Sequence, residues 1–239
     1  MSNSYYRFPQ QTSIHKTVYF IPILNDNYVF VLVNDKNQGL IIDPGSSREV
    51  IDFLENMRIV PVGILITHSH PDHIGGLSKL TAKYPAAIII DHKYSEQLYK
   101  ISSYGFSLEI IFAPGHLKDH IMFYEAKEKW LFCGDVLFRY GCGRIFDGTC
   151  EEMFTSLGKI KKLPMETYIF CTHEYTKKNL EFCIAMDLID KNEIPTLMDE
   201  AERVPTIPFS LNEEIKRNPF LSASSLEYFT NLRLLRNTY

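Results

Sequence analysis

The chain has 239 residues, of which 45% are hydrophobic and 23% are charged, and its formal net charge is −4. This length suits one large domain, or one domain with a small appendage. The composition excludes a disordered or fibrous protein, and the slightly acidic balance argues against a broad surface for nucleic acid or anionic membranes.

The sequence predicts neither a membrane span nor an export signal. No apolar run approaches the roughly 20 residues that a spanning helix needs, and the first residues lack the basic and apolar regions of a secretory signal. The five cysteines are scattered without a CxxC pair, which is typical of reduced thiols. We therefore expect a cytoplasmic monomer that binds no membrane and no nucleic acid.

Short runs rich in β-branched and aromatic residues, separated by turn signals, predict strands through the first two-thirds of the chain. Between them, Ser46 with Glu49 and Thr149 with Glu152 have the form of capping boxes and predict helix starts. Strands mixed with helices indicate layered α/β structure in which helices cover a sheet. The predicted strands are Thr17–Ile21, Tyr28–Val33, Leu40–Ile42, Val62–Thr67, Ala87–Ile90, Ile110–Phe112, Ile121–Tyr124, Trp130–Phe132 and Thr167–Cys171.

The pattern changes after about residue 174, where helical periodicity takes over and no convincing strand remains. Ser210 with Glu213 and Ser224 with Glu227 predict helix starts, and Val204–Phe209, with its two prolines, predicts a break between helices. We therefore expect an α/β domain over residues 1–174 and a helical C-terminal domain over residues 175–239. The second is too small to fold alone, so we expect it to pack against the first.

Three of the eight histidines fall within the segment Thr67-His68-Ser69-His70-Pro71-Asp72-His73. The segment follows an apolar strand pattern, and Pro71 blocks continuation of either a strand or a helix, so it predicts a loop between the two. Crowded imidazoles and a carboxylate are costly to desolvate unless a cation binds them. Nitrogen and oxygen ligands of this kind suit zinc, iron or manganese. The alternative is an exposed turn that happens to be rich in histidine.

Three further candidate ligands follow predicted strands or turn signals. They are His116 after Pro114-Gly115, Asp135 after Gly134, and His173 after Thr172. Taken alone, each is more typical of a hydrogen-bonded structural residue. Together with the first segment they make seven candidate ligands, which exceed one tetrahedral ion but suit two metals with a bridging carboxylate.

At this point the sequence resembles the metallo-β-lactamase-fold hydrolases, whose signature is THxHxDH followed by separate His, Asp and His residues. The resemblance implies a four-layer αββα sandwich with the site at one edge. It also implies which residues hold each metal. His68, His70 and His116 would hold one ion, Asp72, His73 and His173 the other, and Asp135 would bridge both, with Asp72 and Asp135 as the catalytic carboxylates.

Residues outside the metal signature resemble the glyoxalase II family, the hydroxyacylglutathione hydrolases. The resemblance runs essentially from residue 17 to residue 239. The motifs that carry it are Leu24-Asn25-Asp26-Asn27-Tyr28, Ile42-Asp43-Pro44-Gly45, Gly134-Asp135-Val136-Leu137-Phe138, Gly141-Cys142-Gly143-Arg144, His173-Glu174-Tyr175-Thr176, Asn218-Pro219-Phe220-Leu221 and Phe229-Thr230-Asn231-Leu232-Arg233-Leu234-Leu235-Arg236.

The family resemblance implies hydrolysis of S-D-lactoylglutathione, a 2-hydroxyacylglutathione thioester, to glutathione and a 2-hydroxy acid, the second step of methylglyoxal detoxification. A hydroxide held by two divalent metal ions, zinc with iron or manganese as alternatives, would attack the thioester. Arg144, Tyr175, Arg233 and Arg236 would bind the glutathione carrier, since guanidinium groups grip carboxylates.

The chain departs from the family pattern at the carrier site and beside one ligand. Arg236 stands where the family usually has lysine, Phe146 where some members have tyrosine, and Leu117-Lys118-Asp119 where a Thr-x-Gly is usual. The alternatives are a single-iron persulfide dioxygenase or another hydrolase of the same fold, including a ribonuclease, and a non-enzymatic metal-binding module. For Arg233 and Arg236 the alternative is a solvated helix face.

Overall fold

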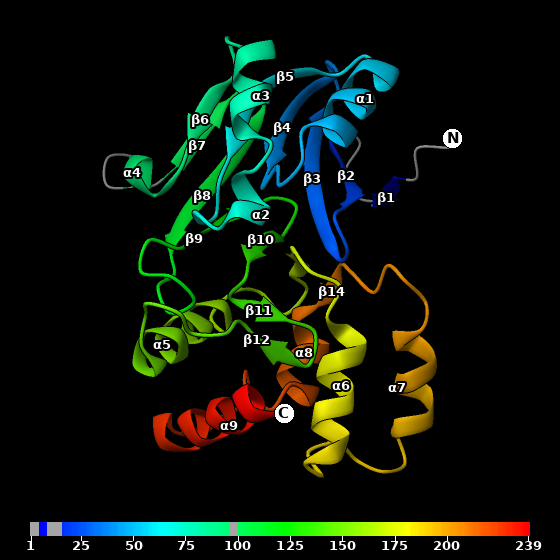
Figure 1. Cartoon of the computed structure of the whole chain (residues 1–239), viewed down its shortest axis with the longest axis vertical. Coiled ribbons are helices and arrows are strands. Elements are labelled where there is room, and N and C mark those ends of the chain that lie inside the picture. Colours follow the sequence, from blue (N-terminus) through cyan, green and yellow to red (C-terminus); the bar gives the residue numbers. More distant parts are fainter. Residues whose placement is uncertain (1–4, 9–15, 96–99) are drawn as a thin grey trace. The chain divides into compact units, whose positions relative to one another are not determined.

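The computed structural model describes residues 5–8, 16–95 and 100–239, and it divides the chain into two compact units. Unit 1 contains the described residues up to Phe112 together with Ile121–Glu128, and unit 2 contains Ala113–His120 and Lys129–Tyr239. Strands and helices alternate through both units (Figure 1), which confirms the predicted mixed α/β class. Among the helices described, none is long and apolar enough to cross a bilayer.

Unit 1 is built around a six-stranded sheet. Its strands pair in sequence order, antiparallel from β1 to β4 and parallel from β4 to β6. The strands are β1 (Tyr6–Phe8), β2 (Lys16–Ile23), β3 (Asn27–Asn34), β4 (Gln38–Ile42), β5 (Val60–Leu65) and β6 (Ile88–Ile90). The parallel pairing places the carboxyl ends of β4 and β5 side by side.

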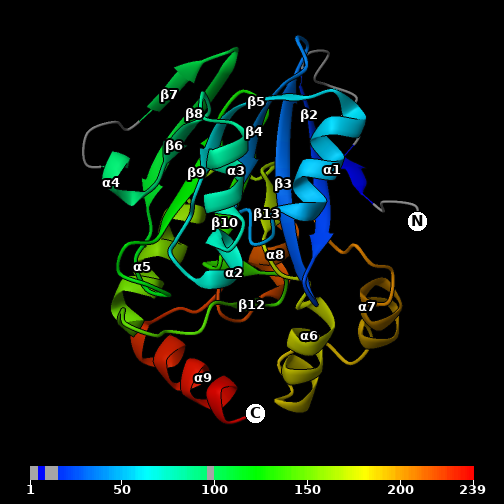
Figure 2. The same cartoon turned by 45° about the horizontal axis from the view of Figure 1, so that its top comes forward.

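Helices α1 (Arg48–Met57) and α3 (Leu77–Lys83) cover one face of this sheet (Figure 2). The apolar stripe of α1 includes Val50 and Phe53, which lie in one buried cluster with alternate residues of the strands, such as Val29 and Val31. Such burial contributes roughly 1.5 to 3 kcal/mol for each large apolar side chain. Unit 1 also contains short helices α2 (Pro71–Ile74) and α4 (His92–Ser95) and the antiparallel strands β7 (Lys100–Ser103), β8 (Phe106–Phe112) and β9 (Ile121–Glu125).

Unit 2 combines short strands with the helices of the C-terminal region. Strand β10 (Trp130–Gly134) pairs in parallel with β13 (Tyr168–Cys171), which pairs antiparallel with β14 (Phe209–Ser210). Strands β11 (Leu137–Phe138) and β12 (Gly141–Cys142) form a hairpin. The helices are α5 (Cys150–Ile160), α6 (Thr176–Ala185), α7 (Ile194–Ala201), α8 (Leu211–Arg217) and α9 (Leu226–Thr238).

Aromatic rings join the helices of unit 2. Phe154 of α5 lies 5.7 Å from Phe229 of α9, and Phe220, which follows α8, lies 6.3 Å from Phe229 and 6.1 Å from Phe182 of α6 (ring centroids). These rings are largely buried, so α5, α6 and α9 share one core. Helices α6, α7, α8 and α9 confirm the expectation that the chain after residue 174 is mainly helical.

Each predicted strand is present, with ends shifted by a few residues, but several other expectations were wrong. Strands β1, β7, β11 and β12 were not predicted, and β14 contradicts the expectation that no strand follows residue 174. The capping box at Thr149 and Glu152 is present. At the other starts, α1 begins one residue later than Ser46 predicts, and α9 is capped by Ser225 instead of Ser224. Ser210 is the N-cap of α8 but makes no side-chain capping bond.

Candidate active site

A cluster of imidazoles and carboxylates in unit 1 lies where β5 ends. The chain leaves β5, passes through Thr67 and His68, and enters α2, for which His70 is the N-cap and Pro71 the first residue. His68 and His73 are buried, and His70 and Asp72 are partly exposed. The predicted loop between strand and helix is present, and its four candidate ligands belong to one short segment.

Asp43 holds this segment in place. It directly follows β4 in a left-handed backbone conformation, with φ of 53°, and its carboxylate is buried. The Thr67 backbone N–H donates to Asp43 Oδ1 at 2.8 Å, and the Thr67 hydroxyl donates to Oδ2 at 2.7 Å. His73 Nδ1 lies 3.0 Å from the same Oδ2. Donation from Nδ1 fixes the ring and leaves Nε2 as the nitrogen that can bind a metal.

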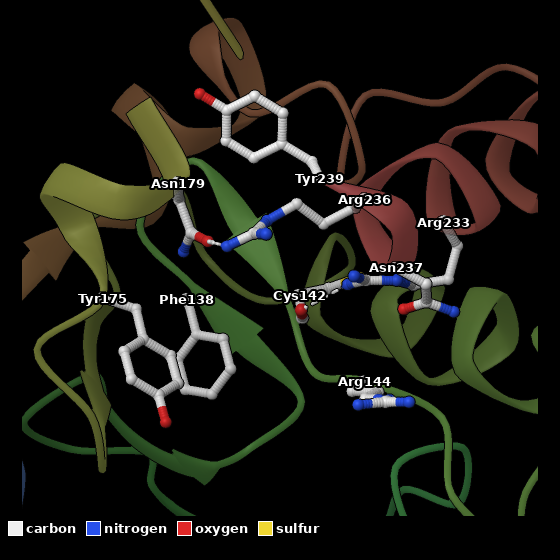
Figure 3. Close-up of a pocket in the computed structure, with 9 residues that line it drawn as sticks. All are labelled: Phe138, Cys142, Arg144, Tyr175, Asn179, Arg233, Arg236, Asn237 and Tyr239. Atoms are coloured by element: carbon white, nitrogen blue, oxygen red, sulfur yellow. Dashed lines mark hydrogen bonds between the residues drawn. The ribbon is translucent and has the colours of Figure 1, made fainter. Parts of the chain in front are cut away.

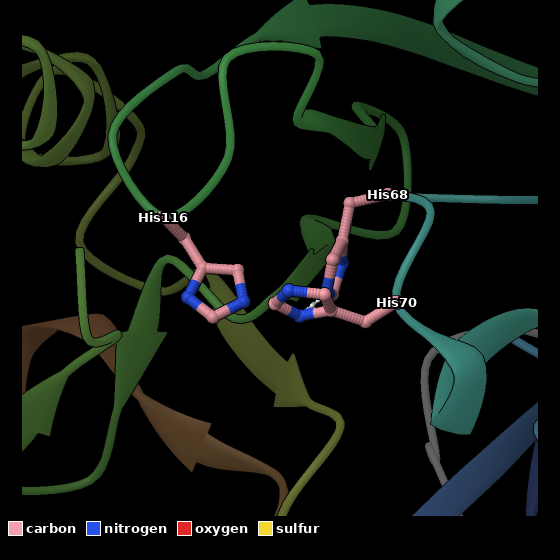
Figure 4. A group of neighbouring side chains, drawn as sticks. All are labelled: His68, His70 and His116. Atoms are coloured by element: carbon pink, nitrogen blue, oxygen red, sulfur yellow. Dashed lines mark hydrogen bonds between the residues drawn. The ribbon is translucent and has the colours of Figure 1, made fainter. Parts of the chain in front are cut away.

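The remaining ligands of the segment are also oriented by neighbours. Asn27, at the start of β3, donates from Nδ2 to Asp72 Oδ2 at 2.9 Å. Figure 4 shows His68 and His70 on the loop that leads into α2, with His68 Nε2 3.1 Å from His70 Nδ1. Two imidazole nitrogens that face one another at this distance are suited to share a cation. A Cβ on Gly45 would come 1.7 Å from the Asp72 carbonyl oxygen, so only glycine lets the loop lie this close.

A second cluster lies in unit 2, where two parallel strands end. Asp135 follows β10, and His173 follows β13, so their side chains meet at the same edge of the strand pair. His173 Nε2 lies 3.4 Å from Asp135 Oδ2, and His116 Nε2 lies 3.6 Å from the same oxygen. All three residues are buried.

Hydrogen bonds determine which nitrogen of His116 faces this carboxylate. His116 lies on the loop Ala113–His120 (Figure 4), and its Nδ1 is 2.6 Å from the carbonyl oxygen of Arg144. Because a carbonyl only accepts, Nδ1 carries the proton and Nε2 presents its lone pair. His120 Nε2 accepts from the Asp135 backbone N–H at 3.2 Å. His120 therefore contacts the cluster as a hydrogen-bond acceptor.

The donors of both clusters fit divalent metal ions. Each cluster combines imidazole nitrogen with carboxylate oxygen, and neither includes a cysteine, which is the set expected for zinc, iron or manganese in a catalytic site. Buried groups of this kind gain little stability from one another without a cation. The sequence and the two clusters therefore indicate a divalent metal site.

Unit 2 also contains a pocket of about 270 Å³ (Figure 3). Three of its nine lining residues are arginines, and none is Asp or Glu. The lining residues are Phe138, Cys142, Arg144, Tyr175, Asn179, Arg233, Arg236, Asn237 and Tyr239. All four residues that the sequence predicts for substrate binding are therefore found in one pocket.

Arg233 and Arg236, from successive turns of α9, are two of the three arginines that give the pocket its positive charge. Arg233 Nη1 donates to the Cys142 carbonyl oxygen at 2.9 Å, whereas its buried Nε has no hydrogen-bond partner among the described residues. Arg236 donates to Asn179 Oδ1 at 3.4 Å, and burial together with the charge of Arg233 lowers its pKa below the usual value. An anion bound here would relieve the repulsion between the two guanidinium groups.

Cys142 lines the same pocket as a protonated thiol. Burial raises the pKa of Cys142 above its usual value, and this outweighs the nearby charge of Arg233. A thiol that is neutral at physiological pH is a poor nucleophile. Cys142 is therefore better suited to a structural role than to nucleophilic attack.

Two contacts connect the pocket to the second cluster. The ring of His173 stacks on Tyr175 with centroids 4.6 Å apart, and Tyr175 lines the pocket. Arg144, which also lines the pocket, supplies the carbonyl oxygen that holds His116. A molecule bound in the pocket would therefore lie next to Tyr175 and Arg144, which contact the candidate ligands His173 and His116.

Two supporting residues were not among the sequence-predicted site residues. Asp43 was noted only as part of a family motif, and Asn179 was not singled out at all. A signal for Asp43 exists in the sequence, since it follows the strand that precedes the histidine segment. Its role depends on the parallel pairing of β4 and β5, which cannot be read from the sequence alone. Nothing in the local sequence marks Asn179.

The fold and the two clusters define a member of the metallo-beta-lactamase superfamily, whose family model matches residues 24–106 and 95–173. Solved structures agree on the fold. The B3 metallo-beta-lactamase BLEG-1 is similar with a TM-score of 0.67 and 22% identity, covering 85% of this chain and 99% of that one. ETHE1 from Myxococcus xanthus has a TM-score of 0.67 and 20% identity, covering 92% and 90%.

Sequence comparison is more specific. Residues 174–239 match the model described as the hydroxyacylglutathione hydrolase C-terminus. The hydroxyacylglutathione hydrolase of Bdellovibrio bacteriovorus is 39% identical over 92% of this chain and 97% of its own length. That of Pelagibacter ubique is 39% identical over 93% and 99%. The chain belongs to the hydroxyacylglutathione hydrolase family, which confirms the resemblance to glyoxalase II.

Proposed function

We propose that this protein is a metal-dependent thioester hydrolase that converts S-D-lactoylglutathione and related 2-hydroxyacylglutathiones to glutathione and a 2-hydroxy acid. The observation that carries this function is the C-terminal match over residues 174–239, which contain two of the three arginines of the pocket. The relatives that match nearly the whole chain are named for the same activity. The reaction would serve as the second step of methylglyoxal detoxification.

We propose that the two clusters together bind two divalent ions, zinc with iron or manganese as alternatives. His68, His70 and His116 would hold one ion, Asp72, His73 and His173 the other, and Asp135 both. When bound, such ions lower the pKa of water to near 7 and polarise a carbonyl group. The tautomers of His73 and His116, fixed by Asp43 and by the Arg144 carbonyl, support this assignment.

The two catalytic carboxylates would orient the attacking water. Asn27 fixes Asp72 Oδ2, so that the other oxygen of Asp72 is turned to a defined position. Asp135 Oδ2 lies within 3.6 Å of two imidazoles, which restricts its direction in the same way. Departure of the thiol requires no strong general acid, because the leaving thiolate has a conjugate acid with a pKa of about 8.5.

The pocket would bind the glutathione carrier. Carboxylates of the tripeptide would pair with Arg144, Arg233 and Arg236, and Tyr175 would line the path toward His173. The contribution is positioning, which raises the effective concentration of the thioester beside the metal site. We propose on this basis that the C-terminal domain, residues 175–239, serves substrate binding, whereas residues 1–174 form the catalytic domain.

The oligomeric state and location are part of the same proposal. We propose a monomer that acts in the cytoplasm. The cysteines are scattered along the sequence without a CxxC pair, which supports a reducing environment. Gel filtration tests the first point, and fractionation of expressing cells tests the second.

An assay of S-D-lactoylglutathione beside a β-lactam and a free-acid lactone tests the function, on protein of measured metal content. We expect hydrolysis of the glutathione thioester and no comparable turnover of the other two. The persulfide dioxygenase alternative is not favoured by the named relatives. It predicts oxygen consumption with glutathione persulfide, and oxygen uptake without thioester hydrolysis would replace the proposal.

A further inference from the structure

The turn at residues 138–141, which joins β11 to β12, is held by side chains from two helices. Each of its carbonyl oxygens accepts a hydrogen bond from a side chain. Asn218 Nδ2 donates to the Phe138 and Gly141 oxygens at 3.0 Å each, Asn179 Nδ2 donates to the Arg139 oxygen at 3.1 Å, and Cys183 Sγ donates to the Tyr140 oxygen at 3.4 Å.

Glu214 of α8 is the acceptor at the centre of this arrangement. Its Oε2 accepts from the Tyr140 backbone N–H at 2.9 Å and from Asn218 Nδ2 at 3.0 Å, and its Oε1 lies 4.0 Å from Arg139 Nε. Glu214 is 1% exposed and Asn218 is fully buried. Hydrogen bonds to a buried carboxylate are among the strong ones, and the groups that they join have no water to replace a lost partner.

The turn also forms part of the pocket wall. Phe138 and Cys142 flank it and line the pocket, and the Cys142 carbonyl oxygen accepts from Arg233. A Cβ on Gly141 would come 2.6 Å from the amide of Asn179, which lines the pocket and binds Arg236. The position of the turn therefore sets the positions of both α9 arginines relative to the pocket wall.

We infer that Glu214 and Asn218, which do not line the pocket, are positioning residues for carrier binding: they fix the 138–141 turn and through it the Cys142 carbonyl and Arg233. This assignment rests on the function proposed above. It predicts that weakening the contact at Glu214 lowers affinity for the thioester without altering the chemistry, because neither residue is among the seven candidate ligands.

Glu214→Gln is the direct test, because glutamine keeps the length of the side chain and one acceptor oxygen but removes the charge. With S-D-lactoylglutathione as substrate at pH 8, where the Glu214 carboxylate carries its charge, we expect KM to rise about three- to tenfold. This is the range for changing a charge-assisted hydrogen bond into a neutral one. We expect kcat and metal content to stay unchanged. The matched control is Glu213→Gln, an exposed neighbour on α8, which should leave KM unaltered.

Thermal unfolding separates positioning from general destabilisation. Removal of a buried charge should leave the unfolding midpoint of Glu214→Gln at pH 8 no lower than that of the wild type, so a higher KM would not come from unfolded protein. An unchanged KM, or a fall in kcat and metal content of the same size, would overturn the inference.

Amide hydrogen exchange supplies a second readout, which needs no substrate. In the wild-type protein we expect strong protection of the Tyr140 amide, and in Glu214→Gln we expect faster exchange across residues 138–142. Rapid wild-type exchange at Tyr140 would overturn the inference. If protection behaves as expected but the wild type does not hydrolyse the thioester, the proposed function is refuted and the role in carrier binding falls with it.

Discussion

Removal of the Arg233 guanidinium should weaken carrier binding and spare the metal site. In Arg233→Ala the pocket loses the buried Nε that has no partner among the described residues, and the Cys142 carbonyl oxygen loses its donor. A hydrogen bond between charged groups contributes about 1.5 to 3 kcal/mol. At about 1.4 kcal/mol for each factor of ten, KM for S-D-lactoylglutathione should rise about 10- to 100-fold, with kcat little changed.

Steady-state kinetics beside metal analysis measures this effect. Arg233→Lys keeps the charge but loses the planar donor group, so its KM should fall between those of the wild type and the alanine variant. Arg203→Ala is the matched control, since Arg203 is exposed and pairs with Asp199 on the surface. If Arg233→Ala has the KM of the wild type, the pocket does not bind the carrier, and Arg233 serves only to hold its own helix.

Three further predictions address the clusters and the buried carboxylate. Asp135→Ala should lose bound metal and activity together, and a variant that retained two ions and full turnover would refute the bridging role. Asp43→Asn should lower metal affinity about 10- to 100-fold, measured by competition with a chelator, because His73 loses the carboxylate that orients it; unchanged affinity would remove Asp43 from the site. Burial raises the pKa of Glu214 from 4.5 to about 7, so the folded state binds more protons than the unfolded state between these values and the free energy of unfolding should fall as pH rises through this window. The wild type should therefore lose about 3 kcal/mol relative to Glu214→Gln between pH 4.5 and pH 8, measured by denaturant unfolding, and parallel pH profiles for the two proteins would contradict it.

The sequence was most informative where the functional residues are consecutive or follow strands. The segment from Thr67 to His73 is unusual in composition, and its place between a strand and a helix follows from local pattern alone. The fold and the other ligands were inferred from the family resemblance, because the spacing of His116, Asp135 and His173 along the chain does not show that they lie close together in space. The structure places His116, Asp135 and His173 in one cluster of unit 2.

The supporting contacts were less predictable because they depend on tertiary structure. Asp43 reaches His73 only because β4 and β5 pair in parallel. Asn218 lies 77 residues from Gly141 along the chain, and no local pattern links an amide after one helix to a hairpin turn. The two-residue strand β14 is likewise defined by its pairing with β13, because two residues are too few to show the alternating pattern that predicts a strand. The cap of α9 moved by one residue because Ser224 and Ser225 are chemically equivalent candidates.

Metal content and thioester hydrolysis, measured on one sample of the protein, show whether the hydrolysis depends on bound metal. Metal-dependent hydrolysis predicts two divalent ions per chain, hydrolysis of S-D-lactoylglutathione that disappears when a chelator removes the ions, and recovery of the activity when zinc, iron or manganese is returned. Full thioester turnover by protein from which all metal has been removed would contradict it, as would a fully metal-loaded protein that leaves the thioester intact.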